Sequence, residues 1–145
     1  MWFELSCVLC LTALTVVLHA AGTFRVLQRL LSSLQREEHA SHFKLSMRRI
    51  LWIIGALLLL HWLEAALWAC FYWAFALLPD FETSMYFSLT SYSTLGYGDV
   101  VLPKTWRLVG PFEAAVGILM FGWSTGVMVA VVSRMYLRQL HTTDG

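Results

Sequence analysis

Residues 94–99, which read Thr-Leu-Gly-Tyr-Gly-Asp between two long apolar stretches, have the composition of a cation-binding loop. A loop that replaces the water shell of a cation must direct successive backbone carbonyl oxygens toward one axis. Such a backbone alternates in handedness, and Gly96 and Gly98 reach positive φ at little cost. Thr94 adds a hydroxyl oxygen at one end of the loop. The segment therefore predicts a row of oxygen ligands formed by Thr94, Leu95, Gly96, Tyr97 and Gly98.

The motif and its flanking apolar segments resemble the pore domain of tetrameric potassium channels, especially the small bacterial ones, from about Glu82 to Arg134. The resemblance implies a homotetramer in the lipid bilayer that conducts K⁺ passively through a selectivity filter. K⁺ would bind at the carbonyls of Thr94, Leu95, Gly96 and Tyr97, with Tyr97 turning its ring away to wedge the loop against its scaffold. Two alternatives stay open: a pore-like interaction subunit that does not conduct, and a weakly selective cation channel. No cofactor is expected apart from K⁺ as the permeant ion.

The composition predicts a membrane protein. Of 145 residues, 59% are hydrophobic and only 13% are charged, and the mean hydropathy is +0.66. A soluble domain of this length rarely has so little charge. The net charge of +1 argues against a nucleic-acid partner, and no residue cluster suggests an enzyme. Cys7 and Cys10 have a redox or metal-like spacing, but their apolar surroundings favour helix packing.

Three apolar segments, at about 5–24, 50–78 and 108–132, meet the requirement of about 20 residues for a membrane span. We therefore expect an all-α membrane protein with three transmembrane helices per subunit, a re-entrant pore helix and a filter loop. The first span is additional to the pore and is expected to be accessory to conduction. The expected organisation is an N-terminal helix with a juxtamembrane extension at 1–36, a basic loop at 37–49, a pore domain at 50–138 and a short tail at 139–145. Within the pore domain we expect an outer helix at 50–78, a pore helix at 82–93, the filter at 94–99 and an inner helix at 107–138.

Basic residues predict the orientation. Eight of the ten lysines and arginines lie between the first two spans or after the third, and the positive-inside rule places these regions in the cytoplasm. The N-terminus and the filter loop would then face outward from a cell membrane, with a bacterial inner membrane expected. The first three arginines start at the edge of the first span, which favours anchoring over voltage sensing. The basic residues that set the expected orientation are Arg25, Arg29, Arg36, Lys44, Arg48, Arg49, Arg134 and Arg138.

Two further groups lie near the expected cytoplasmic side. Four leucines follow an i, i+3, i+4, i+7 pattern that fits a helix lying in the membrane interface: Leu27, Leu30, Leu31 and Leu34. Glu38, His39 and His42 resemble a metal site only superficially, and we expect a solvated loop.

Several residues are expected to support the filter. Pro79 ends the outer helix and Asp80 can cap the pore helix. Thr90 stands where some relatives have a glutamate that pairs with the aspartate after the filter, so Asp99 needs another partner. Glu113 in the inner helix either braces the filter in place of that glutamate or makes a structural hydrogen bond. The expected filter-supporting residues are Asp99, Tyr86, Phe87, Thr90, Ser91 and Glu113.

The inner helix contains candidate hinges, and the spans contain ionisable residues. The family pattern places Gly117 at a gating hinge, with packing as the alternative, and Gly122, five residues later and also a hinge candidate, falls where the family has a Phe-Gly pair. His61 and Glu64 share a helix face at i and i+3, and His19 could join them. This group is either a proton sensor or a satisfied polar contact between helices. What opens the pore is not evident from the sequence.

Overall fold

The computed structural model describes residues 2–35 and 42–143, in which all regular elements are helical. This confirms the expected all-α class. The long helices are α1 (Trp2–Gln35), α2 (His42–Ala74) and α4 (Val109–Thr143). The short helix α3 (Phe81–Tyr92) and a single 3₁₀ turn (Lys104–Trp106) lie between α2 and α4.

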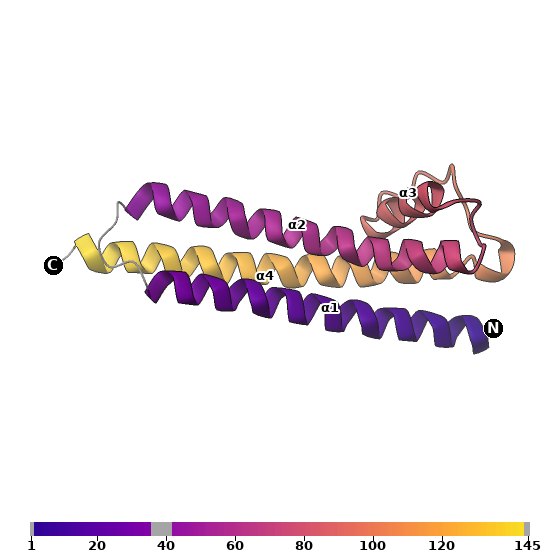
Figure 1. The fold of residues 1–145 in the computed structure, drawn as a ribbon, viewed down its shortest axis with the longest axis horizontal. Helices are drawn as coiled ribbons and strands as arrows, with labels where there is room; N and C mark the ends of the chain where they lie inside the picture. Colours follow the sequence, from indigo (N-terminus) through magenta and orange to yellow (C-terminus); the bar gives the residue numbers. More distant parts are fainter. Residues whose placement is uncertain (1, 36–41, 144–145) are drawn as a thin grey trace.

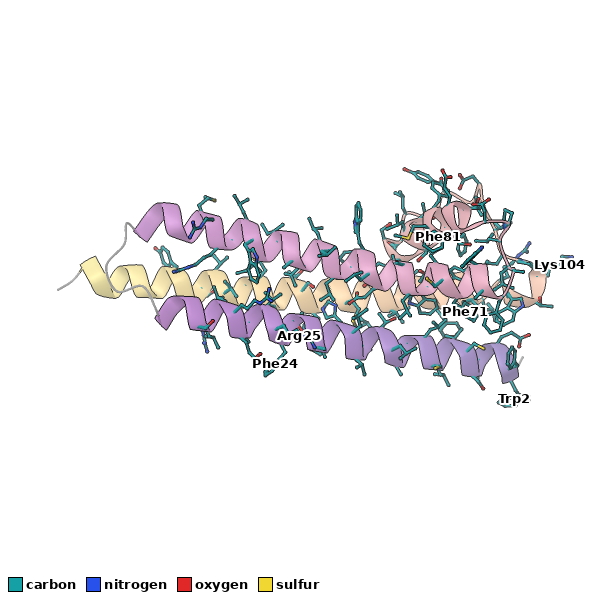
Figure 2. All side chains as sticks on the ribbon, viewed as in Figure 1. Trp2, Phe24, Arg25, Phe71, Phe81 and Lys104 are labelled. Carbon is teal, nitrogen blue, oxygen red and sulfur yellow. The ribbon has the colours of Figure 1, made fainter. Side chains whose placement is uncertain are left out.

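The three long helices run side by side, and α3 folds back beside the end of α2 (Figure 1). The N-terminus lies at the same end of the molecule as α3 and its following loop, whereas the C-terminus, the C-terminal end of α1 and the N-terminal end of α2 lie at the opposite end. Figure 2 shows Trp2 and Lys104 at the first end and Arg25 toward the second. Tyr92, the last residue of α3, contacts both α2 and α4, because its hydroxyl bonds Glu64 and its ring packs against Phe121.

Each long helix has a segment that is long and apolar enough to cross a membrane: Trp2–Ser32, Met47–Ala74 and Lys104–Arg134. The chain is therefore a multi-pass membrane protein with three candidate spans. Because α3 has only 12 residues, it extends about 18 Å at 1.5 Å per residue, too short to cross the hydrocarbon core of roughly 30 Å.

The helix boundaries differ from the expected ones where the chain turns. Helix α2 ends at Ala74, four residues before Leu78, because the chain forms a hydrogen-bonded cap there. The Leu77 amide donates to the Tyr72 carbonyl at 2.9 Å, and the Ala76 amide donates to the Trp73 carbonyl at 3.0 Å. Ala76 has a φ of 52°, the left-handed conformation that ends helices in this motif and that glycine usually occupies. An alanine in this position gives no sequence signal for the cap.

The other ends shift less or extend the helices. Helix α2 begins at His42, eight residues before the expected start at Ile50, and α3 covers 81–92 instead of 82–93. Helix α4 covers 109–143 instead of 107–138, so it includes most of the expected tail. Asp80 caps α3 as expected: its carboxylate accepts from the Thr83 amide at 2.7 Å and from the Thr83 hydroxyl at 3.0 Å.

Two buried apolar clusters hold the bundle together. The larger one joins α1, α2, α3 and α4 around Trp68, Tyr72, Tyr92 and Met120, with Cys7 packed against it. The smaller one contains Val26, Leu30, Ile53, Leu57 and Val131. Leu30 thus packs in a core instead of facing the membrane interface as expected, whereas Leu27 and Leu31 are exposed.

Some predicted positions cannot be placed. Arg36, Glu38 and His39 lie outside the described residues, and so do the side chains of Leu34, His42, Lys44 and Arg138.

Candidate ion-conduction site

The segment after α3 has an alternating backbone. Positive φ angles occur at Thr94 (61°), Gly96 (51°) and Gly98 (77°), and neither Leu95 nor Tyr97 shares them. Among the residues that the structure describes, an ideal Cβ at Gly96 or Gly98 would meet no atom within 4 Å beyond the glycine and its two chain neighbours. The two positions therefore require glycine for its backbone conformation and not for space.

Thr94 in the left-handed region is a feature that the sequence did not indicate, because a β-branched residue rarely adopts positive φ. Such a conformation costs about 1–3 kcal/mol and persists where the surrounding structure enforces it. Here the last turn of α3 supplies hydrogen bonds: the Thr94 amide donates to the Ser91 carbonyl at 2.9 Å, and the Gly96 amide donates to the Thr90 carbonyl at 3.0 Å. Thr90 and Ser91 thus hold the segment through their backbone, while the Thr90 hydroxyl bonds the Phe87 carbonyl of its own helix.

Residues 93–99 are exposed in the single chain. Tyr97 is 66% exposed and Leu95 is 56% exposed. The helices of its own chain do not bury the Tyr97 ring, so the expectation that Tyr97 wedges the loop against its scaffold stays a prediction for the assembled protein.

Asp99 finds its partner on the pore helix. The Tyr86 hydroxyl donates to the Asp99 carboxylate at 2.6 Å, and this hydrogen bond lowers the pKa of Asp99 below its ordinary value. Tyr86 thereby connects α3 to the end of the loop. This hydrogen bond takes the place of the one that a carboxylate at the position of Thr90 would make with Asp99. Phe87 instead turns inward, with its ring edge-on to Tyr72 at 5.1 Å between centroids.

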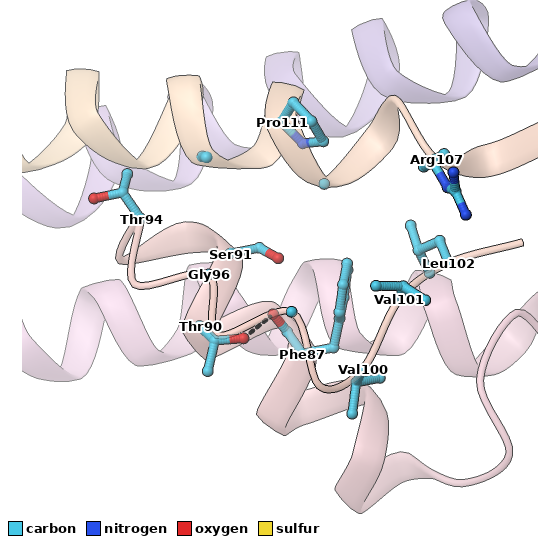
Figure 3. A pocket seen from close by; sticks show the side chains of 13 residues that line it. Phe87, Thr90, Ser91, Thr94, Gly96, Val100, Val101, Leu102, Arg107 and Pro111 are labelled. Carbon is cyan, nitrogen blue, oxygen red and sulfur yellow. Dashed lines mark hydrogen bonds between the residues drawn. The ribbon is translucent and has the colours of Figure 1, made fainter. Parts of the chain in front are cut away.

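A hollow of about 330 Å³ lies behind the loop, between α3 and the first turns of α4. Its lining includes Phe87, Thr94 and Gly96 on one side and Pro111 on the other, with Arg107 at one end (Figure 3). The loop is therefore not packed solidly against α4. Its hydrogen bonds to α3 hold it in place.

Glu113 is fully buried and joins three helices. Its carboxylate accepts from the Tyr72 hydroxyl of α2 at 2.7 Å and from the Ser88 hydroxyl of α3. The Ser88 hydroxyl also lies 2.7 Å from the Ala65 carbonyl. Glu113 thus holds α3 between α2 and α4. Its partner on α3 is Ser88, six residues before Thr94, which favours the structural hydrogen bond over a direct brace of the filter.

The two candidate hinge glycines lie in different surroundings on a helix that is continuous from Val109 to Thr143. An ideal Cβ at Gly117 would lie 2.0 Å from the Tyr92 carbonyl oxygen, whereas at Gly122 it would meet nothing within 4 Å. Gly117 therefore allows the end of α3 to touch α4, which favours the packing alternative for this residue.

The ionisable residues of the spans come together as one buried polar cluster. His19 Nδ1 lies 2.8 Å from Glu64 Oε1, and His61 Nδ1 lies 3.4 Å from Glu64 Oε2. Tyr92 and Ser124, which the sequence did not single out, complete the cluster. The Tyr92 hydroxyl donates to Glu64 Oε2 and lies 3.1 Å from His61 Nδ1. Ser124 Oγ lies 3.1 Å from His61 Nε2 and 3.4 Å from His19 Nε2.

His19, His61 and Glu64 offer ligand atoms within 4.8 Å of one another, a spacing that a metal ion could use. The hydrogen bonds already account for the arrangement without one. Every nitrogen and oxygen atom of these five side chains has a hydrogen-bond partner within the cluster. A buried polar group that is fully hydrogen-bonded needs no counter-ion.

The fold and the site together define a multi-pass membrane protein with a re-entrant helix that ends in a loop of alternating backbone hand. Residues 48–134 match a protein family described as ion channel. The match covers more than half of the chain, which therefore belongs to the ion channel family. Helix α1 lies outside the matched residues. A search of curated proteins and a search of solved structures found no match.

Proposed function

We propose that the chain forms a homotetrameric, K⁺-selective channel that conducts passively down the electrochemical gradient. The observation that carries this proposal is the alternation of positive φ at Thr94, Gly96 and Gly98. These residues directly follow α3, which is too short to cross the membrane. A backbone that alternates in hand turns successive carbonyls toward one side, and rings of carbonyls replace the hydration shell of K⁺ in a selectivity filter. Thr94, Leu95, Gly96 and Tyr97 would supply these oxygens.

The pore helix favours a cation at the same place. The C-terminal end of a helix has partial negative charge, and α3 ends at Tyr92, two residues before Thr94. The orientation of α3 is also consistent with this, because α3 folds back along α2 and its C-terminal end points toward the middle of the bundle's length (Figure 1).

Assembly follows from the exposure of the loop. One loop supplies oxygens from one side only, so four copies around a common axis are required to surround an ion. The exposed ring of Tyr97 would then pack against the neighbouring subunit. Large apolar side chains that one chain leaves exposed on α4 are available for subunit contacts or lipid: Phe112, Ile118, Leu119, Phe121 and Trp123.

The proposed orientation places the N-terminus and the filter outside and the C-terminus in the cytoplasm of a cell membrane, a bacterial inner membrane being expected. The N-terminus and the filter loop share one end of the bundle, and the C-terminal end of α1, the N-terminal end of α2 and the C-terminus share the other. Arg25 and Arg29 of α1 and Arg48 and Arg49 of α2 lie toward this second end in sequence. The positive-inside rule assigns the second end to the cytoplasm.

Flux through purified protein tests whether the chain conducts. Proteoliposomes loaded with K⁺ should release it when the wild-type protein is present, and Gly96→Ala should lose selective K⁺ flux. A non-conducting interaction subunit would assemble as a tetramer but release no K⁺, and this result would refute the proposal. A weakly selective cation channel would release K⁺ and Na⁺ at similar rates.

A further inference from the structure

The buried polar cluster joins all four α-helices, and its member from α3, Tyr92, lies two residues before the start of the filter at Thr94. His19 comes from α1, His61 and Glu64 from α2, Tyr92 from α3 and Ser124 from α4. All five are buried, and His19 and Glu64 are fully so. We call these five residues the polar ring.

Tyr92 is held at several points. Its hydroxyl donates to Glu64 and contacts His61, its ring packs edge-on against Phe121 at 5.5 Å, and its carbonyl lies against Gly117. The side chain is 2% exposed. A residue held at its hydroxyl, ring and carbonyl has little freedom to move without the helices around it.

The filter starts from the same turn of α3. The Ser93 amide donates to the Leu89 carbonyl at 3.1 Å, and the Thr94 amide donates to the Ser91 carbonyl at 2.9 Å. Any rotation or shift of Tyr92 is therefore transmitted within two residues to Thr94, whose backbone is in a conformation that the surroundings must enforce.

Glu64 connects Tyr92 to α1, because its two oxygens serve different partners. Oε1 lies 2.8 Å from His19, and Oε2 accepts from Tyr92. Without His19, the buried Oε1 would lose its donor, and a buried carboxylate with an unsatisfied oxygen shifts to find another. That shift acts directly on the Tyr92 hydroxyl. Glu113 bonds Tyr72 and Ser88 and lies outside this ring.

We propose that the polar ring positions the inner end of the filter, with Tyr92 as the positioning residue and His19 as the contribution of α1. The additional helix is then part of the filter's support and not accessory to conduction as the sequence suggested. The proposal rests on the proposed channel function, in which residues 94–98 are the filter.

The test compares His19→Leu with a control substitution on the same face of α1, Thr15→Val, and adds a rescue variant and a variant of Tyr92. His19→Leu removes the link to Glu64. Thr15→Val, one turn away, removes a different buried α1–α2 hydrogen bond, in which Trp68 Nε1 donates to Thr15 Oγ1 at 3.0 Å and which does not involve α3. His19→Asn keeps an N–H group near the Nδ1 position and serves as the rescue variant. Tyr92→Phe removes only the hydroxyl and provides a second route if His19→Leu does not fold.

Two readouts are recorded in tetramers of full-length protein. The first is the ¹⁹F NMR spectrum of fluorotyrosine-labelled protein, in which Tyr92 reports on the ring and Tyr97 on the filter, each assigned by Tyr→Phe substitution. The second is single-channel open probability with the K⁺-over-Na⁺ permeability ratio. The NMR readout needs no conduction, so it separates failure of this proposal from failure of the channel function, which wild-type recordings test alone.

We expect His19→Leu and Tyr92→Phe to move the Tyr97 resonance and to change open probability by about threefold or more, with His19→Asn close to wild type. In the Tyr92→Phe background, His19→Leu should have a much smaller effect, as residues in one network are not additive. Thr15→Val should leave both readouts unchanged. If His19→Leu leaves the Tyr97 resonance and permeation at wild-type values, or if Thr15→Val changes them equally, the polar ring only packs the helices and the proposal is wrong.

Discussion

Gly117→Ala tests how closely the pore helix approaches the inner helix. The added methyl group would lie 2.0 Å from the Tyr92 carbonyl oxygen and 2.9 Å from its carbonyl carbon. Carbon–oxygen contacts are comfortable from about 3.3 Å, so the two segments must separate by about 1.3 Å. Overpacking of this kind costs typically about 1–3 kcal/mol. Because the obstacle is backbone and not the tip of a flexible side chain, we expect about 3 kcal/mol per subunit.

Gly122→Ala is the matched control on the same helix. Its methyl group would meet nothing within 4 Å in the chain, and alanine is favoured over glycine in a helix by about 1 kcal/mol. Thermal unfolding of the two variants in detergent should therefore give a lowered midpoint for Gly117→Ala and an unchanged or raised midpoint for Gly122→Ala. K⁺ flux should fall in the first variant, because the displaced segment is two residues from Thr94.

The result separates packing from bending. If Gly117 served only as a hinge, alanine would stiffen α4 and change opening without loss of stability. Equal unfolding midpoints for Gly117→Ala and Gly122→Ala would refute the close contact with Tyr92.

Three further predictions concern the filter and its supports. Gly98→Ala should lose K⁺-over-Na⁺ selectivity in bilayer recordings while tetramers persist on gel filtration, because alanine disfavours the positive φ of this position. Gly55→Ala on α2, where a Cβ also meets nothing within 4 Å, is the control and should leave selectivity intact. Glu113→Ala should lower thermal stability by about 1–3 kcal/mol because the buried Tyr72 hydroxyl loses its acceptor, whereas Glu113→Gln keeps an acceptor oxygen and should stay near wild type; equal midpoints for both would contradict the contact. Tyr86→Phe should destabilise the protein at neutral pH. The lowered pKa of Asp99 means that this contribution is present above the ordinary carboxyl value of 3.8 and is lost as the pH falls through the lowered value. A difference between Tyr86→Phe and wild type that persists unchanged in acid would show that the Tyr86–Asp99 hydrogen bond is not its source.

Much of the fold is readable from the sequence because the bilayer imposes simple lengths. Runs of about 20 apolar residues predict spans, and Pro79 with Asp80 predicts where the pore helix starts. The end of α2 is not readable, because an alanine occupies the left-handed cap position that glycine would have marked. The extension of α4 to Thr143 is also unmarked, since polar residues after a span fit a helix and a tail equally well.

In the site too, the sequence predicts what depends on residue type and spacing, and it does not predict what depends on contacts between helices. Gly96 and Gly98 indicate their backbone by residue type, but the positive φ of Thr94 depends on hydrogen bonds to α3. His61 and Glu64 are recognisable as a pair by their i, i+3 spacing. The roles of Tyr92 and Ser124 depend on which helix faces meet, and an aromatic or a serine in an apolar helix carries no signal of that. Likewise, the close packing of Gly117 is a property of the helix pair and not of the glycine.

The most direct test of the central claim is the reversal potential of reconstituted wild-type protein with K⁺ on one side of a bilayer and Na⁺ on the other. Since a filter of carbonyl rings is built for dehydrated K⁺, currents should reverse at a potential far from zero, of the sign that K⁺ selectivity requires. A reversal potential close to zero would mean that K⁺ and Na⁺ permeate equally, and it would contradict the assignment of residues 94–98 as a potassium-selectivity filter.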